Sequence, residues 1–213
     1  MLTRLDLRTN LKAFYSPSAK AMQVVDVPRF QFLMIDGSIE PGQGPGTSPG
    51  FKEAMQALYN ASYTLKFMFK QRKADPVDYP VMALEGLWWV EDDHFDINVK
   101  DNWYYTVMIL QPDLVTPELL GEALAQMRKK KGNLPAFARL RLEAFQEGLC
   151  VQVMHIGPYA TEPATVERMK AFEGEHGYRI TGRHHEIYMG NPLLAAPEKL
   201  KTILRHPVTP AAS

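Results

Sequence analysis

The chain has 213 residues, 46% of them hydrophobic, and its 24 basic and 24 acidic residues leave a formal net charge of zero. That length suits one domain with a substantial core, or two small modules fused into one body. The balanced charge excludes the positive field that nucleic-acid binding requires, so we expect no direct nucleic-acid partner. The single cysteine, Cys150, excludes an intramolecular disulfide, and its apolar neighbours favour a small core residue over a catalytic thiolate.

The chain shows no secretory signal at its N-terminus and no apolar stretch long enough to cross a bilayer. We therefore expect a cytoplasmic protein without a membrane partner. Nothing in the sequence indicates its oligomeric state.

The first half of the chain combines several strand signals with one clear helix. Residues 1–23 show only weak periodicity and predict an N-terminal extension that wraps over the surface. Residues 41–50 are rich in glycine and proline and predict a loop, either a connector or a mobile lid. This loop lacks the Gly-Lys-Ser/Thr ending of a phosphate-binding loop. Around it, the pattern predicts a helix over residues 51–72 and strands over residues 24–39, 78–90 and 102–110.

The second half repeats this order after a connecting helix. That helix begins at Thr116 and ends at Gly132, and the basic run in its last turn complements the helix dipole. We prefer this interpretation to a phosphate or membrane patch. A turn is expected at residues 146–148. The remaining pattern predicts a helix over residues 161–176 and strands over residues 136–143, 149–156, 185–189 and 200–206.

The matching order of the two halves predicts an internal duplication. We expect residues 24–207 to form one domain of two pseudo-repeats, about 24–112 and 133–207, followed by a tail over residues 208–213. We expect an α+β fold of duplicated strand-helix-strand-strand modules. Its antiparallel sheet carries helices on one face and leaves a central ligand cleft between the two copies.

Two neighbouring predicted strands carry an excess of large aromatic side chains, including all three tryptophans of the chain. Alternation along the first strand puts Glu85 and Trp89 on one face and Trp88 on the other, so both faces are largely apolar. A sheet with helices on one face should have one polar face, and this hairpin has none. The cluster is either an aromatic core or the lining of a groove for a flat ligand, and the pattern alone leaves both open.

A second group of candidates lies in the run His184–Pro192. Glu186 and Tyr188 share one strand face, and an acid in an apolar strand is costly to bury unless it is paired or functional. An exposed edge strand is the alternative. A metal site would need His184, Glu186 and the distant His155, but zinc sites usually show clearer spacing, so we expect no metal. No dinucleotide fingerprint or nucleophile elbow is present, and we expect no cofactor.

These motifs resemble a known family. The pattern Glu-hydrophobic-Tyr-hydrophobic followed by Asn-Pro, here in Glu186–Pro192, and the run Leu149–Tyr159 resemble the GyrI-like small-molecule-binding domain. The Leu84–Trp89 and Trp103–Tyr105 runs resemble a longer stand-alone subgroup, the cyclopropanoid cyclopropyl hydrolase-like proteins. The resemblance covers roughly residues 24–207, and the order of the motifs is more specific than any one of them.

The resemblance implies two strand-helix-strand-strand modules about a pseudo-twofold axis, with a ligand cleft between them. In many relatives this domain follows a helix-turn-helix and senses drugs for a transcription regulator. The 23 residues before Val24 are too few for such a DNA-binding domain, so the chain resembles the free-standing form. Some free-standing relatives hydrolyse cyclopropane-bearing cytotoxins with an aromatic cage and a cleft carboxylate.

By position, Glu186 matches the family's cleft acid and is the candidate that activates water, with Tyr188 or Tyr105 donating to the developing oxyanion. The resemblance equally fits a pure binder that sequesters a toxin or senses a drug. A gyrase-inhibiting interaction protein is a third class, without support from an acidic tail. The candidate ligand-binding residues are Trp89, Trp103, Tyr105, Glu85 and Met108.

Overall fold

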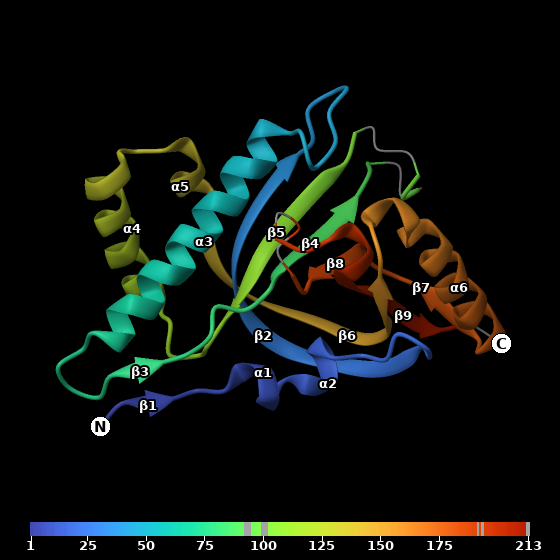
Figure 1. The fold of residues 1–213 in the computed structure, drawn as a ribbon, viewed down its shortest axis with the longest axis horizontal. Coiled ribbons are helices and arrows are strands. Elements are labelled where there is room, and N and C mark those ends of the chain that lie inside the picture. The colour runs from blue at the N-terminus through green and yellow to red at the C-terminus, as the bar shows by residue number, and fades with distance from the viewer. Residues whose placement is uncertain (92–94, 99–101, 191, 193, 212–213) are drawn as a thin grey trace.

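The structure is a computed structural model that describes all residues except 92–94, 99–101, 191, 193 and 212–213. Its centre is an antiparallel barrel in which β9 closes the ring against β6 (Figure 1). In order around the ring, the strands are β6 (Arg141–Ile156), β2 (Gln23–Ser38), β5 (Tyr104–Gln111), β4 (Leu84–Trp89), β8 (His184–Tyr188) and β9 (Lys201–Pro210). A short strand, β7 (Tyr178–Ile180), pairs with the end of β9.

The two halves of the chain contribute the same succession of elements. The first supplies β2, helix α3 (Pro49–Lys70), β4 and β5, and the second supplies β6, helix α6 (Glu162–Glu175), β8 and β9. The halves meet where β2 pairs with β6 and where β4 pairs with β8. This arrangement confirms the predicted α+β fold of duplicated modules with antiparallel pairing. The closure of the sheet into a ring goes beyond the prediction.

Helix α3 follows from its capping residue and its apolar stripe. The Ser48 side chain accepts a hydrogen bond from the backbone N–H of Phe51 at 3.0 Å, and Pro49 occupies the first turn. The stripe that this helix buries includes Leu58 and Leu65. Helices α4 (Pro117–Lys131) and α5 (Pro135–Arg139) pack against α3. In Figure 1, α3 and α6 lie on opposite sides of β4 and β8.

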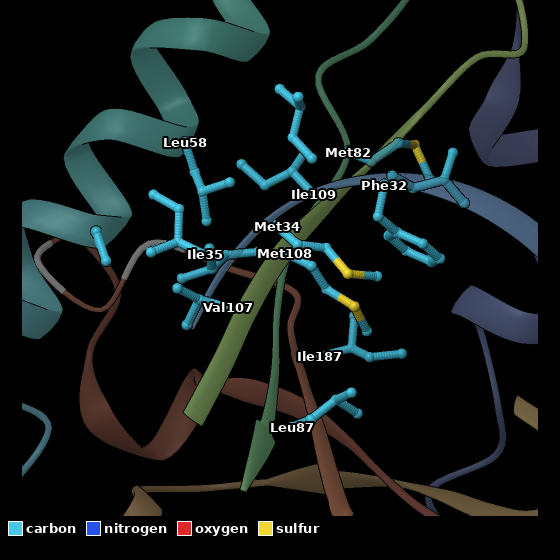
Figure 2. Packing of buried hydrophobic residues seen from close by; sticks show 14 of the residues in the cluster. Phe32, Met34, Ile35, Leu58, Met82, Leu87, Val107, Met108, Ile109 and Ile187 are labelled. Carbon is cyan, nitrogen blue, oxygen red and sulfur yellow. The ribbon is translucent and has the colours of Figure 1, made fainter. Parts of the chain in front are cut away.

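The buried apolar side chains form two layers, one on each side of the strand wall. Figure 2 shows Leu58 of α3 beside Ile35, Val107 and Ile109, with Met34, Met108 and Ile187 on the other side of β5. We call the helix-covered side the outer face and the enclosed side the barrel interior. Because strand residues alternate, the β4, β5 and β8 side chains divide between these two environments.

The N-terminal segment does more than wrap over the surface. Strand β1 (Thr3–Arg4) pairs in parallel with β3 (Val77–Asp78), and helices α1 (Leu7–Asn10) and α2 (Lys12–Tyr15) follow. Tyr15 is buried, and its hydroxyl donates to a Glu85 carboxylate oxygen at 2.6 Å. The prediction of a loose extension is therefore wrong for this residue, whose side chain enters the barrel.

Strand β6 differs from its prediction. Residues 135–139 form α5, and the strand then runs without a turn through Gly148, which has a φ of 76°. The left-handed backbone at Gly148 reverses the alternation of side chains between the two faces of the strand. As a result, Glu147 and Gln152 both hydrogen-bond Arg205 in the barrel interior. Residues five apart on a regular strand would face opposite sides.

No helix among the described residues has the length and apolar character needed to cross a membrane.

Candidate functional site

Glu186 lies on the outer face where the two halves of the chain meet. On β8 it is the cross-strand partner of Gly86 on β4, and it is 6% exposed. In the same register, Trp88 is opposite His184 and Leu84 is opposite Tyr188. Cross-strand partners share a face, so these side chains surround the Glu186 carboxylate.

Both oxygens of Glu186 have short-range partners. The Tyr188 hydroxyl donates to Oε2 at 2.7 Å, and Trp88 Nε1 donates to that hydroxyl at 3.1 Å. The other oxygen, Oε1, lies 3.2 Å from His184 Nε2. Burial and the adjacent Glu186 carboxylate raise the pKa of Tyr188 above its ordinary value, so the phenol keeps its proton at neutral pH.

Gly86 makes room for this group. A Cβ at residue 86 would lie 2.8 Å from Trp88 Nε1 and 3.3 Å from the Tyr188 hydroxyl. The Trp88 ring is 1% exposed and cannot move aside easily. A glycine opposite Glu186 is therefore what allows the indole and the phenol to meet beside the acid.

Aromatic rings extend the site along the outer face. The Trp88 ring centroid lies 5.3 Å from Phe51 and 5.3 Å from Trp103, and Trp103 lies 4.8 Å from Phe95. On the α6 side, the Tyr159 ring meets Tyr188 edge to face at 6.0 Å. Such rings offer a large apolar surface with polar edges, which suits a flat ligand.

The pKa of Tyr159 also indicates that negative charge is concentrated near Glu186. Burial and the carboxylates of Glu162 and Glu186 raise the pKa of this phenol to about 12. The side chain belongs to the 3₁₀ turn η1 (Tyr159–Thr161), just before α6. The surroundings of Glu186 are thus aromatic and acidic, a combination that favours ligands with an electron-poor or cationic ring system.

Of the residues predicted for the site, Glu186, Tyr188, Trp103 and Tyr105 all lie on this outer face. Tyr105 packs against Phe51 at 5.0 Å, but its hydroxyl lies over Gly37, and the charged groups that affect its pKa are Arg139, Glu40 and Glu53. Its ring belongs to the cluster, whereas its hydroxyl points away from Glu186. Tyr188 is the phenol that contacts the acid.

Three predicted ligand-binding residues do not lie on the same face as Glu186. Glu85, Met108 and Trp89 alternate onto the other face of their strands. Glu85 and Met108 are fully buried in the barrel interior. Trp88 is the tryptophan beside the acid. The sequence pattern showed that Trp88 and Trp89 face opposite ways, but only the register with β8 identifies which one faces Glu186.

A cavity of about 530 Å³ opens at the mouth of the barrel rather than at Glu186. Trp89 and Tyr104 line it, with the Arg183 guanidinium 3.4 Å from the Trp89 ring centroid. Glu186 is instead covered by its neighbouring side chains. A ligand reaches Glu186 only if at least one of the surrounding rings moves.

Two further residues belong to the site and were missed by the sequence analysis. His184 Nδ1 lies 3.2 Å from His206 Nε2, and His206 Nδ1 lies 2.8 Å from Glu173 Oε1 on α6. We call Glu186, His184, His206 and Glu173 the acid–histidine chain. No local motif marks His206 or Glu173, because three separate elements bring them together. Within the described part of the molecule, no three His, Cys, Asp or Glu side chains are placed to hold one metal ion.

A second polar group fills the barrel interior. His185 Nδ1 lies 2.9 Å from Glu147 and its Nε2 lies 3.1 Å from Glu85, while Arg205 donates to Glu147 at 3.0 Å. We call these four residues the interior ion cluster. Burial opposes ionisation, but the mutual charges lower the pKa of Glu147 to about 2 and raise that of His185 to about 9.

Cys150 is fully buried, and burial raises its thiol pKa, as the prediction of a core residue requires.

Comparison with known proteins places this geometry in a family. Residues 20–209 match the model of the GyrI-like small molecule binding domain. The crystal structure of an uncharacterized conserved protein from Listeria innocua is 40% identical and covers 96% of this chain and 100% of its own, with a TM-score of 0.86. A hydrolase from Listeria innocua is 38% identical over 96% of this chain and 100% of its own, with a TM-score of 0.80.

Similarity to more distant solved structures supports the fold alone. The C-terminal domain of EcmrR is 10% identical, covers 90% of this chain and 98% of its own, and has a TM-score of 0.53. No curated protein matches the chain.

Proposed function

The chain belongs to the GyrI-like small-molecule-binding family, and on that basis we propose that it binds planar hydrophobic molecules beside Glu186 and hydrolyses those that are electrophilic. The observation that carries this proposal is the Glu186–Tyr188–Trp88 hydrogen-bonded group, buried among aromatic rings on the outer face. A carboxylate in such a setting can act as a general base, and the rings hold a flat substrate beside it. The 38%-identical hydrolase from Listeria innocua supports the catalytic part.

The substrate class that suits this group is an electron-poor cyclopropane fused to a conjugated carbonyl. Water attacks the ring methylene, the carbon–carbon bond of the cyclopropane breaks, and its electron pair moves to the carbonyl oxygen. Glu186 takes the proton from water, and the oxyanion is stabilised by a donor such as the Tyr188 hydroxyl before it is protonated. Addition of one water to a DNA-alkylating compound of this kind would remove its electrophile and protect the cell.

A second candidate function is binding without turnover. Both Glu186 oxygens already have partners, which favours a fixed negative group that a cationic or electron-poor ligand meets. Such a protein would sequester a toxin or signal its presence. The acid and the rings serve either role, so only a reaction product separates them.

The test is incubation with a panel of cyclopropane-bearing alkylators, followed by mass spectrometry. A hydrolase adds the mass of one water to at least one compound, and the Glu186→Gln protein at equal concentration does not. Binding of planar cations or electron-poor drugs by calorimetry, with every panel compound unchanged, would support the binder instead. If neither turnover nor binding is detected with any compound of either set, the assignment of this face as the ligand site is refuted.

A further inference from the structure

Four buried side chains form one unbroken row from Glu186 on β8 to Glu173 on helix α6. Glu186 Oε1 lies 3.2 Å from His184 Nε2, and His184 Nδ1 lies 3.2 Å from His206 Nε2. The row ends where His206 Nδ1 lies 2.8 Å from Glu173 Oε1. All four residues are buried, so the acid–histidine chain has three contacts at hydrogen-bond distance and little access to water.

The number of protons in this row determines what it can do. Each contact joins two atoms that carry lone pairs, so each needs one proton to be a hydrogen bond rather than a repulsion. Two ionised carboxylates and two neutral imidazoles bring two protons, one fewer than the three contacts between them. The row therefore has a place for one more proton, which also reduces the negative charge that must be buried.

Glu173 is the group best placed to keep that proton. Its Oε2 is buried and has no hydrogen-bond partner among the residues described, a costly situation for a charged carboxylate. At the other end, Glu186 Oε2 accepts the hydrogen bond from Tyr188. Between them, burial lowers the pKa of His184 even though Glu186 opposes the shift, which keeps that imidazole neutral.

We infer that the acid–histidine chain is a proton relay that restores Glu186 to its ionised form after Glu186 has taken a proton from water. This inference rests on the hydrolytic function proposed above. At the start, both carboxylates are ionised and both imidazoles carry their proton on Nδ1. Glu186 receives the proton from water and passes one to His184 Nε2. His184 Nδ1 then gives its proton to His206 Nε2, and His206 Nδ1 gives its proton to Glu173 Oε1.

The sum of these steps is the transfer of one proton from water to Glu173. Both imidazoles finish neutral with their proton on Nε2, and Glu186 finishes as a carboxylate. Reversal of the same steps returns the proton from Glu173 to Glu186 and on to the product oxyanion, which completes the addition of one water and resets the row for the next turnover. The histidines thus act as positioning and relay groups, while Glu186 alone contacts the reacting water. Their tautomers must change together, because the contact between them holds one proton at a time.

Besides the row, the titratable groups around Glu186 are Tyr188 on β8, Tyr159 on η1, Glu162 on α6 and His155 on β6. The two phenols and the histidine do not offer a competing path. Both phenols have raised pKa values and keep their protons at neutral pH. The two His155 ring nitrogens lie 2.9 Å from Thr165 Oγ1 and 3.2 Å from Thr161 Oγ1, so this histidine is engaged elsewhere.

Nitrogen-15 NMR of histidine-labelled protein tests the relay without a substrate, because it distinguishes Nδ1–H from Nε2–H rings. We expect His184 and His206 to show the same tautomer. We expect Glu173→Gln to change the tautomer populations of both rings, although only His206 contacts residue 173. The matched control is Glu175→Gln, which changes an exposed glutamate of the same helix and is expected to alter neither ring.

Opposite tautomers at the two histidines, or a response confined to His206, would overturn the relay. His206→Gln provides a second variant. In that background, Glu173→Gln is expected to leave His184 unchanged, because the row is already interrupted. A His184 response that persists there would show that Glu173 acts on it by another route.

Turnover measurements separate this inference from the proposed function. On a substrate that the wild type hydrolyses, Glu173→Gln is expected to lower kcat by about tenfold or more with an unchanged KM, within the range of proton-transfer effects. Unchanged kcat would overturn the relay even if the NMR coupling is present. Absence of turnover in the wild type would refute the hydrolytic function, and with it the relay's catalytic role, while coupled tautomers would still establish the proton-sharing row.

Discussion

Two glutamate–histidine groups lie back to back on β8 and β9. His184 and His185 are neighbours in the sequence, but His184 joins the acid–histidine chain on the outer face and His185 joins the interior ion cluster. In the interior, the two carboxylates of Glu85 and Glu147 face a guanidinium and a protonated imidazole. On the outer face, two carboxylates face two imidazoles, and neither forms an ion pair with a described Lys or Arg.

The difference shows that buried glutamates and histidines can either stabilise the fold or move protons, depending on the charges around them. Carboxylates with matched cations and several hydrogen bonds remain ionised in a buried site, and their role is to hold strands and the N-terminal segment together. Carboxylates beside imidazoles have no permanent positive charge next to them, so protons can move between the carboxylates and the imidazoles. We therefore expect changes in the interior to affect stability and changes on the outer face to affect binding and turnover.

The largest expected effect is on turnover. Glu186→Gln should reduce kcat on a hydrolysed substrate by ~10²–10⁴-fold, the usual size of a general-base contribution, while affinity stays near that of the wild type. Glu85→Gln is the matched change in the interior, and it should lower thermal stability with little loss of kcat in the folded fraction. Comparable kcat losses in the two variants would contradict the division between the faces.

The next effect concerns stability alone. Arg205→Met removes the cation that contacts Glu147, Gln152 and the backbone oxygen of Phe14. Leaving buried carboxylates without their partner costs about 3–5 kcal/mol, so urea denaturation should show a large loss of unfolding free energy. Arg179→Met, an exposed arginine on β7, should change the midpoint little. An unchanged midpoint for Arg205→Met would mean that the cluster does not hold the barrel.

The interior ion cluster also predicts how stability varies with pH. The pKa of Glu147 is lowered to about 2, so its contribution is present above 4.5 and is lost as the pH falls toward 2. The pKa of His185 is raised to about 9, so its contribution is present below 6.5 and is lost as the pH rises toward 9. Melting temperatures should therefore be highest between these windows. His185→Gln should remove the decline on the alkaline side, and a wild-type curve that is flat up to pH 9 would contradict this assignment.

A smaller effect is expected where Gly86 makes room for the outer site. Gly86→Ala places a Cβ against Trp88 and Tyr188, and overpacking of this kind costs about 1–3 kcal/mol. The displaced phenol should also weaken ligand binding, measured by titration calorimetry. Gly121→Ala on α4 adds the same methyl where nothing lies within 4 Å, and it should be neutral or stabilising. Equal behaviour of the two variants would argue against a crowded site at Gly86.

The smallest effect compares the two adjacent tryptophans. Trp88→Phe keeps the ring but removes the hydrogen bond to Tyr188, worth about 0.5–1.5 kcal/mol, so ligand affinity should fall by about tenfold or less. Trp89→Phe, on the other side of the strand, should leave affinity unchanged. A larger loss for Trp89→Phe would move the ligand site from the outer face to the mouth of the barrel.

Local signals explain which parts of this architecture could be predicted. Ser48 and Thr116 cap their helices with side-chain hydrogen bonds, and the apolar stripes behind them are regular. The Glu186–Tyr188 pair follows from spacing two apart on one strand. By contrast, the choice between Trp88 and Trp89 depends on how β4 is aligned with β8, which no local pattern contains.

The missed residues have physical reasons of the same kind. Gly148 was predicted to turn the chain, because a glycine after polar residues usually marks a turn, yet pairing with Val27 keeps it within a long strand. Glu173 and His206 are 33 residues apart and acquire their contact only when α6 packs against β9. Ring closure likewise depends on β6 meeting β9, a pairing of strands from opposite ends of the second half.

Strand β9 has a consequence for how the protein folds. Its neighbouring residues Arg205 and His206 point to opposite faces and complete the interior ion cluster and the acid–histidine chain, respectively. The Arg205 contact with Phe14 joins residues 191 positions apart. Loop-closure entropy must be overcome before such distant pairings become favourable, which makes them slow to form. Folding intermediates without β9 therefore lack the Arg205 partner of Glu147 on one side of the sheet and the His206 partner of Glu173 on the other, and the docking of β9 supplies both at once.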